Sequence, residues 1–149
     1  SATFMNATYQ AGSASYSPPN GNSLPAIPKR QLFAGLQWSE KGFAQAGHKP
    51  ALGMEAGLDM IHRSSMWGND ANTATTSDYA LAPSYTLLNA RVRQRYQVGP
   101  ARVEAFVGID NITNKDTVSS VIINQFSKQY FEPGLPRSWV IGVQSQIPL

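Results

Sequence analysis

Three arginines on alternate residues, Arg91, Arg93 and Arg95, are the side chains whose type and spacing most clearly suggest chemistry. A period of two places their guanidinium groups on one face of a β-strand. Such a stripe can guide an anionic ligand, contact a neighbouring domain, or form ion pairs within its own sheet. The short segment Gln97–Pro100 predicts a hairpin that sets Glu104 opposite Arg93 or Arg95. We therefore expect cross-strand ion pairs, with Arg93 and Glu104 in structural roles.

The composition excludes several other kinds of chemistry. The formal net charge is only +3 over 149 residues, and no aromatic platform accompanies the arginines, so we expect no nucleic-acid partner. The sequence has no Cys and only 2 His, which argues against thiolate or multi-imidazole metal sites. It has no Gly-x-Ser-x-Gly motif and no carboxylate pair with a second catalytic signal. We expect no enzyme activity, no catalytic residue, no metal and no cofactor.

A second set of candidates lies in or beside long polar segments, where recognition residues concentrate in proteins. These side chains are aromatic, imidazole or carboxylate groups that could touch a ligand, or they could serve ordinary loop packing. The candidates are Tyr16, His62, Trp67, Asp70 and Tyr79. We interpret Glu132 and Arg137 as structural, because they flank the tight segment Pro133–Pro136 and fix the start of the last strand.

The elements that must position these residues are β-strands. No useful stretch shows the apolar period of an amphipathic helix, and no run approaches the ~20 apolar residues of a transmembrane helix. Apolar and polar residues instead alternate in six segments that contain none of the ten Pro residues. The chain is therefore predicted to be all-β, an antiparallel meander of about six long strands. The predicted strands are Thr3–Tyr9, Gln31–Trp38, Ala51–Ile61, Tyr85–Tyr96, Ala101–Asn111 and Trp139–Ile147.

Alternation alone fits either a soluble β-sandwich or a membrane barrel. Three features favour the barrel. Most of the predicted strands have the roughly 9–11 residues of a tilted membrane strand. Aromatic residues such as Trp38, Tyr96 and Trp139 lie at strand ends, as in an interfacial girdle. The long connections Gln10–Pro28, Arg63–Pro83 and Ile112–Arg137 alternate with shorter ones, as in outer-membrane barrels.

Four segments carry a resemblance to a known family. A loop that leads into a strand contains Leu-Pro and a basic residue after Pro, and another strand opens after a loop ending in Pro. A third segment is similar to Asn-Leu-Phe-Asp-Lys, and a fourth carries Gly-x-Pro-Arg before the last strand. In this order, along nearly the whole chain, they resemble the C-terminal β-barrel of TonB-dependent outer-membrane receptors. The segments are Gly21–Arg30, Tyr85–Arg91, Asp110–Lys115 and Phe131–Trp139.

The resemblance implies a fold, a place and a function. Residues 1–149 would be about the last six strands of a transmembrane β-barrel in the bacterial outer membrane. The whole protein would import a scarce metal chelate, such as an iron–siderophore complex. Its partners would be outer-membrane lipid, the remaining strands, the plug domain and the chelated ligand. Family members carry a plug and an N-terminal TonB box; we expect neither in this chain, so TonB would act only through another part.

Two alternatives from other classes remain open at this point. One is a passive porin or a plain structural barrel; a plug and TonB box in the rest of the protein would favour a transporter over it. The other is a soluble β-sandwich that binds a ligand, which the need for detergent would distinguish.

Overall fold

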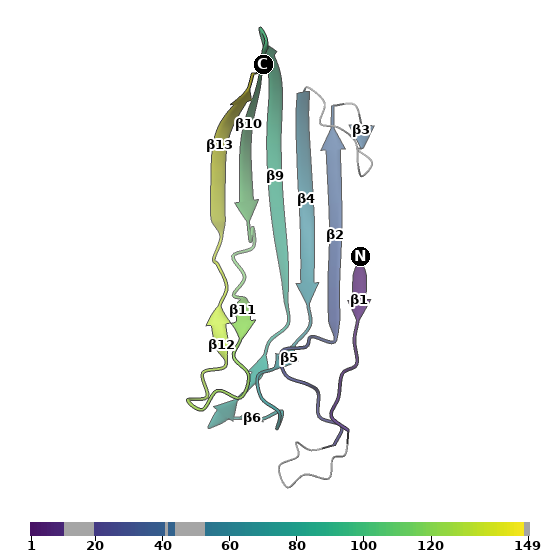
Figure 1. Cartoon of the computed structure of the whole chain (residues 1–149), viewed down its shortest axis with the longest axis vertical. Coiled ribbons are helices and arrows are strands. Elements are labelled where there is room, and N and C mark those ends of the chain that lie inside the picture. The colour runs from purple at the N-terminus through teal and green to yellow at the C-terminus, as the bar shows by residue number, and fades with distance from the viewer. Residues whose placement is uncertain (11–19, 41, 44–52, 148–149) are drawn as a thin grey trace. The chain divides into compact units, whose positions relative to one another are not determined.

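A computed structural model describes residues 1–10, 20–40, 42–43 and 53–147 (Figure 1). These residues form strands and turns and no helix. Consequently, no helix in the described part of the chain is long and apolar enough to cross a membrane.

The main sheet has seven strands, of which six follow one another both in the chain and in space. Their spatial order is β1-β2-β4-β9-β10-β13, and the two-residue strand β3 pairs with β2. This order confirms the predicted antiparallel meander of six strands. The strands are β1 (Ala2–Phe4), β2 (Arg30–Ser39), β3 (Gly42–Phe43), β4 (Gly53–Arg63), β9 (Tyr85–Val98), β10 (Ala101–Asp110) and β13 (Ser138–Gln146).

The first predicted strand was too long. Regular pairing of β1 with β2 ends at Phe4, opposite Arg30. Beyond it, only separate contacts remain, such as the Met5 N–H to Lys29 carbonyl bond at 3.0 Å and a bridge between Thr8 and Ser23. The facing segment contains two prolines, which lack an N–H, and it turns through a positive φ of 59° at Ala26. A regular ladder cannot continue along such a partner.

The β9–β10 hairpin is tighter than expected. Val98 pairs with Ala101, so only Gly99 and Pro100 form the turn. Gly99 has a φ of +57°, a conformation that glycine adopts without steric cost. This turn fixes the register that brings the charged residues of both strands together.

The chain divides into two compact units, which we describe separately. The sheet unit comprises Ala34–Met60, Leu87–Asn114 and Arg137–Leu149. The connection unit comprises Ser1–Phe33, Ile61–Thr86 and Lys115–Pro136. The three long connections predicted from the sequence therefore gather mainly in one unit.

The apolar face of the sheet unit is uncovered. Register places Val107 of β10 opposite Val92 of β9 and Ile141 of β13. Ile141 is 78% exposed, and the two valines are each more than a third exposed. Trp38, Tyr96 and Trp139, near strand ends, are exposed as well. A soluble sandwich would bury these side chains against a second sheet.

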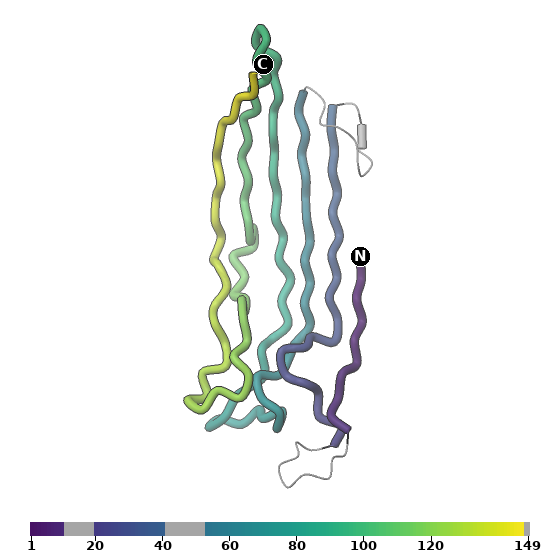
Figure 2. The backbone as a smooth tube through the Cα atoms, in the orientation of Figure 1, coloured from purple at the N-terminus to yellow at the C-terminus, as the bar shows by residue number. Residues whose placement is uncertain are grey.

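The connection unit has a small core and three short two-stranded sheets. The buried side chains of Met66, Ala82 and Val118 pack together, with Val121 and Phe131 against them. Gly68 is required nearby, because a Cβ atom there would lie 2.7 Å from the Cβ of Tyr130. The backbone of the two later connections, residues 63–83 and 112–137, can be followed in Figure 2. The strands are β5 (Met66–Trp67) with β8 (Leu81–Ala82), β6 (Ala74–Thr75) with β7 (Asp78–Tyr79), and β11 (Val118–Val121) with β12 (Phe131–Pro133).

Candidate functional site

The charged residues of β9 and β10 lie on the face opposite the exposed apolar row. Glu104 of β10 pairs in register with Arg95 of β9 and with Gln144 of β13. Of the two partners predicted for Glu104, Arg95 is therefore the one directly opposite, and Arg93 lies opposite Phe106.

Arg95 is the centre of a buried ion-pair triad. Its guanidinium contacts Glu104 and lies 2.9 Å from a carboxylate oxygen of Glu55 on β4. The arginine side chain is 5% exposed, and the glutamates are 12% and 13% exposed. Burial of this kind is tolerated only when the charges are paired and hydrogen-bonded. The triad therefore links three neighbouring strands.

The other two arginines of the stripe are paired more loosely, and also with β4. Arg93 lies 3.9 Å from Glu55, which Arg95 already engages, and Arg91 lies 3.4 Å from Asp59. The side chain of Arg91 is 54% exposed, and exposed pairs contribute little to stability. Sequence reasoning missed Glu55 and Asp59 as partners, although the alternation of their strand already placed both on its polar face.

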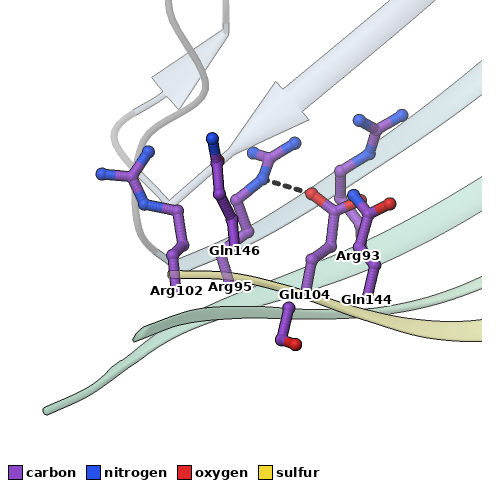
Figure 3. Close-up of a pocket in the computed structure, with 7 residues that line it drawn as sticks. Arg93, Arg95, Arg102, Glu104, Gln144 and Gln146 are labelled. Atoms are coloured by element: carbon purple, nitrogen blue, oxygen red, sulfur yellow. Dashed lines mark hydrogen bonds and ion pairs between the residues drawn. The ribbon is translucent and has the colours of Figure 1, made fainter. Parts of the chain in front are cut away.

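A pocket of about 450 Å³ opens beside the triad (Figure 3). We call it the basic pocket; it lies among β9, β10 and β13. Arg102, which the sequence did not single out, lines it and has no ion-pair partner in the described part of the chain. The lining residues are Arg93, Arg95, Arg102, Glu104, Gln144, Ser145 and Gln146.

The connection unit contains a second polar cluster, centred on Asp70. One carboxylate oxygen of Asp70 accepts a hydrogen bond from the Tyr9 hydroxyl, and the other accepts one from the Asn124 amide at 2.7 Å. The Asp70 N–H donates in return to the Asn124 side-chain oxygen at 3.0 Å, and the Asp70 carbonyl accepts from Asn22 at 2.9 Å. One residue thus binds segments from all three long connections or their flanks.

Two asparagines extend this cluster. Asn72 accepts a bond from the Ser23 N–H at 2.8 Å and donates to the Ser23 carbonyl at 2.9 Å. Asn69, which is buried, donates to Thr73 and accepts from the Thr73 N–H at 3.1 Å. Asparagine side chains thus supply partners for backbone groups that no ladder satisfies.

Tyr130, which directly precedes β12, links the β11–β12 sheet with the β6–β7 sheet. Its hydroxyl donates to a carboxylate oxygen of Asp78 at 2.8 Å, and its side chain is 4% exposed. Burial first, and then the hydrogen bond to Asp78, raise the pKa of the Tyr130 phenol above its usual value of 10.0. The nearby Lys128 ammonium donates to the Ser77 carbonyl at 3.2 Å.

The structure places four of the five candidate ligand-contacting residues. His62, at the end of β4, has Nδ1 3.0 Å from the Thr86 hydroxyl. Trp67 is half-buried, and its carbonyl accepts a bond from the Ala26 N–H. Tyr79 is 56% exposed, whereas both carboxylate oxygens of Asp70 are engaged within the protein. Tyr16 lies outside the described residues.

The two residues predicted to fix the start of the last strand make separate contacts. The carboxylate of Glu132 accepts a bond from the Ser120 hydroxyl, between β12 and β11. The backbone N–H of Arg137 donates to the Asn114 side chain at 3.0 Å, and this bond ties the residue before β13 to the turn that follows β10. Within the described ranges, no three His, Asp or Glu residues come together as metal ligands.

A family model described as TonB dependent receptor-like, beta-barrel matches residues 1–112. The crystal structure of BauA, the ferric preacinetobactin receptor from Acinetobacter baumannii, is similar over 85% of this chain and 16% of that chain, with 24% identity and a TM-score of 0.63. The ferric citrate transporter FecA in its unliganded form is similar over 85% of this chain and 18% of that chain, with 22% identity and a TM-score of 0.64. The chain thus spans less than a fifth of either structure, and the likeness shows a shared barrel-wall fold.

Proposed function

Because the chain belongs to the TonB-dependent receptor-like β-barrel family, we propose that it forms part of a bacterial outer-membrane transporter that imports a metal chelate. Proteins of this family are receptors and transporters of the outer membrane. Since they are not enzymes, family membership confirms the expectation that this chain is not one.

The observation that carries the proposal is the two-faced sheet. One face presents apolar side chains such as Ile141, which is 78% exposed, and the other carries the buried Arg95 triad and the basic pocket. A sheet of this kind suits a barrel wall, with lipid on one side and a polar lumen on the other. A soluble module would need its apolar face covered.

The names of the similar structures support a metal chelate as the cargo. One is the receptor for ferric preacinetobactin and the other a transporter of ferric citrate. We therefore propose an iron–siderophore complex or a similar scarce chelate as the ligand class.

We further propose that residues 1–149 are about the last six strands of the barrel. The remaining strands and the plug would complete the lumen, and TonB would act through a part of the receptor outside this chain. The long connections would face the outside, with ligand contacts at His62, Trp67 and Tyr79, and at Tyr16 in the first connection. Asp70, also a candidate, would hold the connections in place.

Uptake in living cells tests this function. The gene that encodes the full receptor is deleted, and accumulation of radiolabelled iron supplied as ferric citrate or as ferric siderophores is measured. Uptake is compared in cells with and without the receptor, and with and without TonB. The proposal is supported if uptake of at least one chelate is lost when either protein is missing. Uptake that requires the receptor but not TonB would favour the passive porin instead. Recovery of the protein in a soluble fraction without detergent would favour the soluble module.

A further inference from the structure

The basic pocket has the size of a small-ligand site. Its volume of about 450 Å³ falls within the range of ligand sites in proteins, roughly 300–1,000 Å³. Its arginine, glutamate and glutamine side chains project from the same face of β9, β10 and β13 (Figure 3). All of them belong to the sheet unit, so the pocket does not depend on how the two units are arranged.

Positive charge in the basic pocket exceeds negative charge. The Arg95 guanidinium is neutralised by Glu55 and Glu104, and both carboxylates are thereby committed. Arg93 has only the distant contact of 3.9 Å with Glu55, and Arg102 is exposed with no ion-pair partner among the described residues. Two guanidinium groups therefore retain most of their capacity to bind an anion.

The neutral side chains of the pocket are consistent with the same preference. Gln144 donates its amide to Glu104 at 3.3 Å, which takes up a further acceptor position on that carboxylate. Gln146 pairs in register with Arg102 and can add an amide donor beside its guanidinium. Planar guanidinium groups bind oxyanions through paired hydrogen bonds.

We infer that the basic pocket is an oxyanion site that takes a carboxylate or phosphate group at Arg102, beside the amide of Gln146. The group belongs either to a small free anion or to an acidic side chain from another part of the receptor. This inference stands on the pocket itself and does not require that the receptor transports a chelate.

Thermal unfolding of the purified full-length receptor in detergent tests the inference and separates the two sources. The wild type and Arg102→Gln are compared in chloride buffer without added oxyanion, and then with citrate or inorganic phosphate. If a free anion is the ligand, citrate or phosphate raises the Tm of the wild type. Arg102→Gln then weakens the apparent affinity by about tenfold, the loss expected for one charge-assisted hydrogen-bonding group, and leaves the Tm without added anion unchanged.

If an acidic side chain of the receptor already fills the site, the opposite pattern is expected. Arg102→Gln then lowers the Tm without any added anion, and citrate and phosphate have no effect on the wild type. Arg102→Lys keeps the charge but not the guanidinium fork, so in either case it retains part of the effect. Lys29→Gln removes the same charge at an exposed position in the connection unit and should match the wild type.

The inference is overturned if neither anion changes the Tm of the wild type and Arg102→Gln also leaves it unchanged. It is likewise overturned if Lys29→Gln has the same effect as Arg102→Gln, because the response would then report net charge and not the pocket.

Discussion

Removing the arginine at the centre of the triad should destabilise the barrel wall far more than removing its exposed neighbour. Arg95→Met keeps a long apolar stem but leaves Glu55 and Glu104, each less than 15% exposed, without their shared cation. Breaking a buried pair in this way costs about 3–5 kcal/mol, because an uncompensated charge stays buried. Arg91→Met breaks a pair whose arginine is 54% exposed, so the expected cost is below about 1 kcal/mol.

The assay is urea unfolding of the full-length receptor reconstituted in lipid vesicles, followed by tryptophan fluorescence. A fall in the midpoint at constant slope reports the loss of stability. A triple variant combines Arg95→Met with Glu55→Gln and Glu104→Gln and so removes all three charges. It should recover most of the stability that Arg95→Met loses, since neutral replacements of buried ion pairs are often well tolerated. If Arg95→Met is no less stable than Arg91→Met, or if the triple variant is the least stable, the reasoning about buried charge is wrong.

Three further predictions concern the connections and the apolar face. Asp70→Asn replaces the carboxylate that Tyr9 and Asn124 bind, and should weaken the cluster by about 1–3 kcal/mol; limited proteolysis should then cut all three connections faster, whereas Asp116→Asn, at an exposed position, should leave them unchanged. The folded state raises the pKa of the Tyr130 phenol, so folding holds its proton more tightly. The stability of the connection unit should therefore be intact below pH 10.0 and fall as the pH rises through the raised pKa. Hydrogen exchange measured against pH should show this fall in the wild type and not in Tyr130→Phe. Ile141→Arg should lower the stability of the receptor in lipid by about 2–4 kcal/mol if that residue lies near the bilayer midplane. Val140→Arg, on the opposite face, should be tolerated. Equal losses of stability for the two variants in a vesicle folding assay would contradict the assignment of the faces.

The strands and much of the register were predictable because they depend on local pattern. Alternation placed the six strands, and the short turn after Val98 restricted the partner of Glu104 to two residues, of which Arg95 is the one found. The strand Thr3–Tyr9 was overpredicted because its pairing depends on a proline-containing segment about twenty residues away, which the alternation of the strand itself does not reflect.

The candidate sites were less predictable because their contacts join distant parts of the sequence. Glu55 and Arg95 belong to strands separated by the long connection Arg63–Pro83, so no short turn fixes their pairing. The hydrogen bonds of Asp70 to Asn22 and Asn124 span 48 and 54 residues. Asparagine and aspartate are common in all polar loops, and nothing local distinguishes those that join several connections from those that contact only solvent.

The cluster around Asp70 has a consequence for how such a receptor can diversify. Insertions or deletions near Asn22, Asp70 or Asn124 would disturb all three connections together, so selection should preserve the length of these segments. Tyr79 and Phe126, which is 99% exposed, take no part in these bonds and can be exchanged without loosening them. Evolution toward a new ligand would then proceed by exchange of such exposed residues on a constant framework, and comparison of natural variants should find variability at Tyr79 and Phe126 and constancy at Asp70.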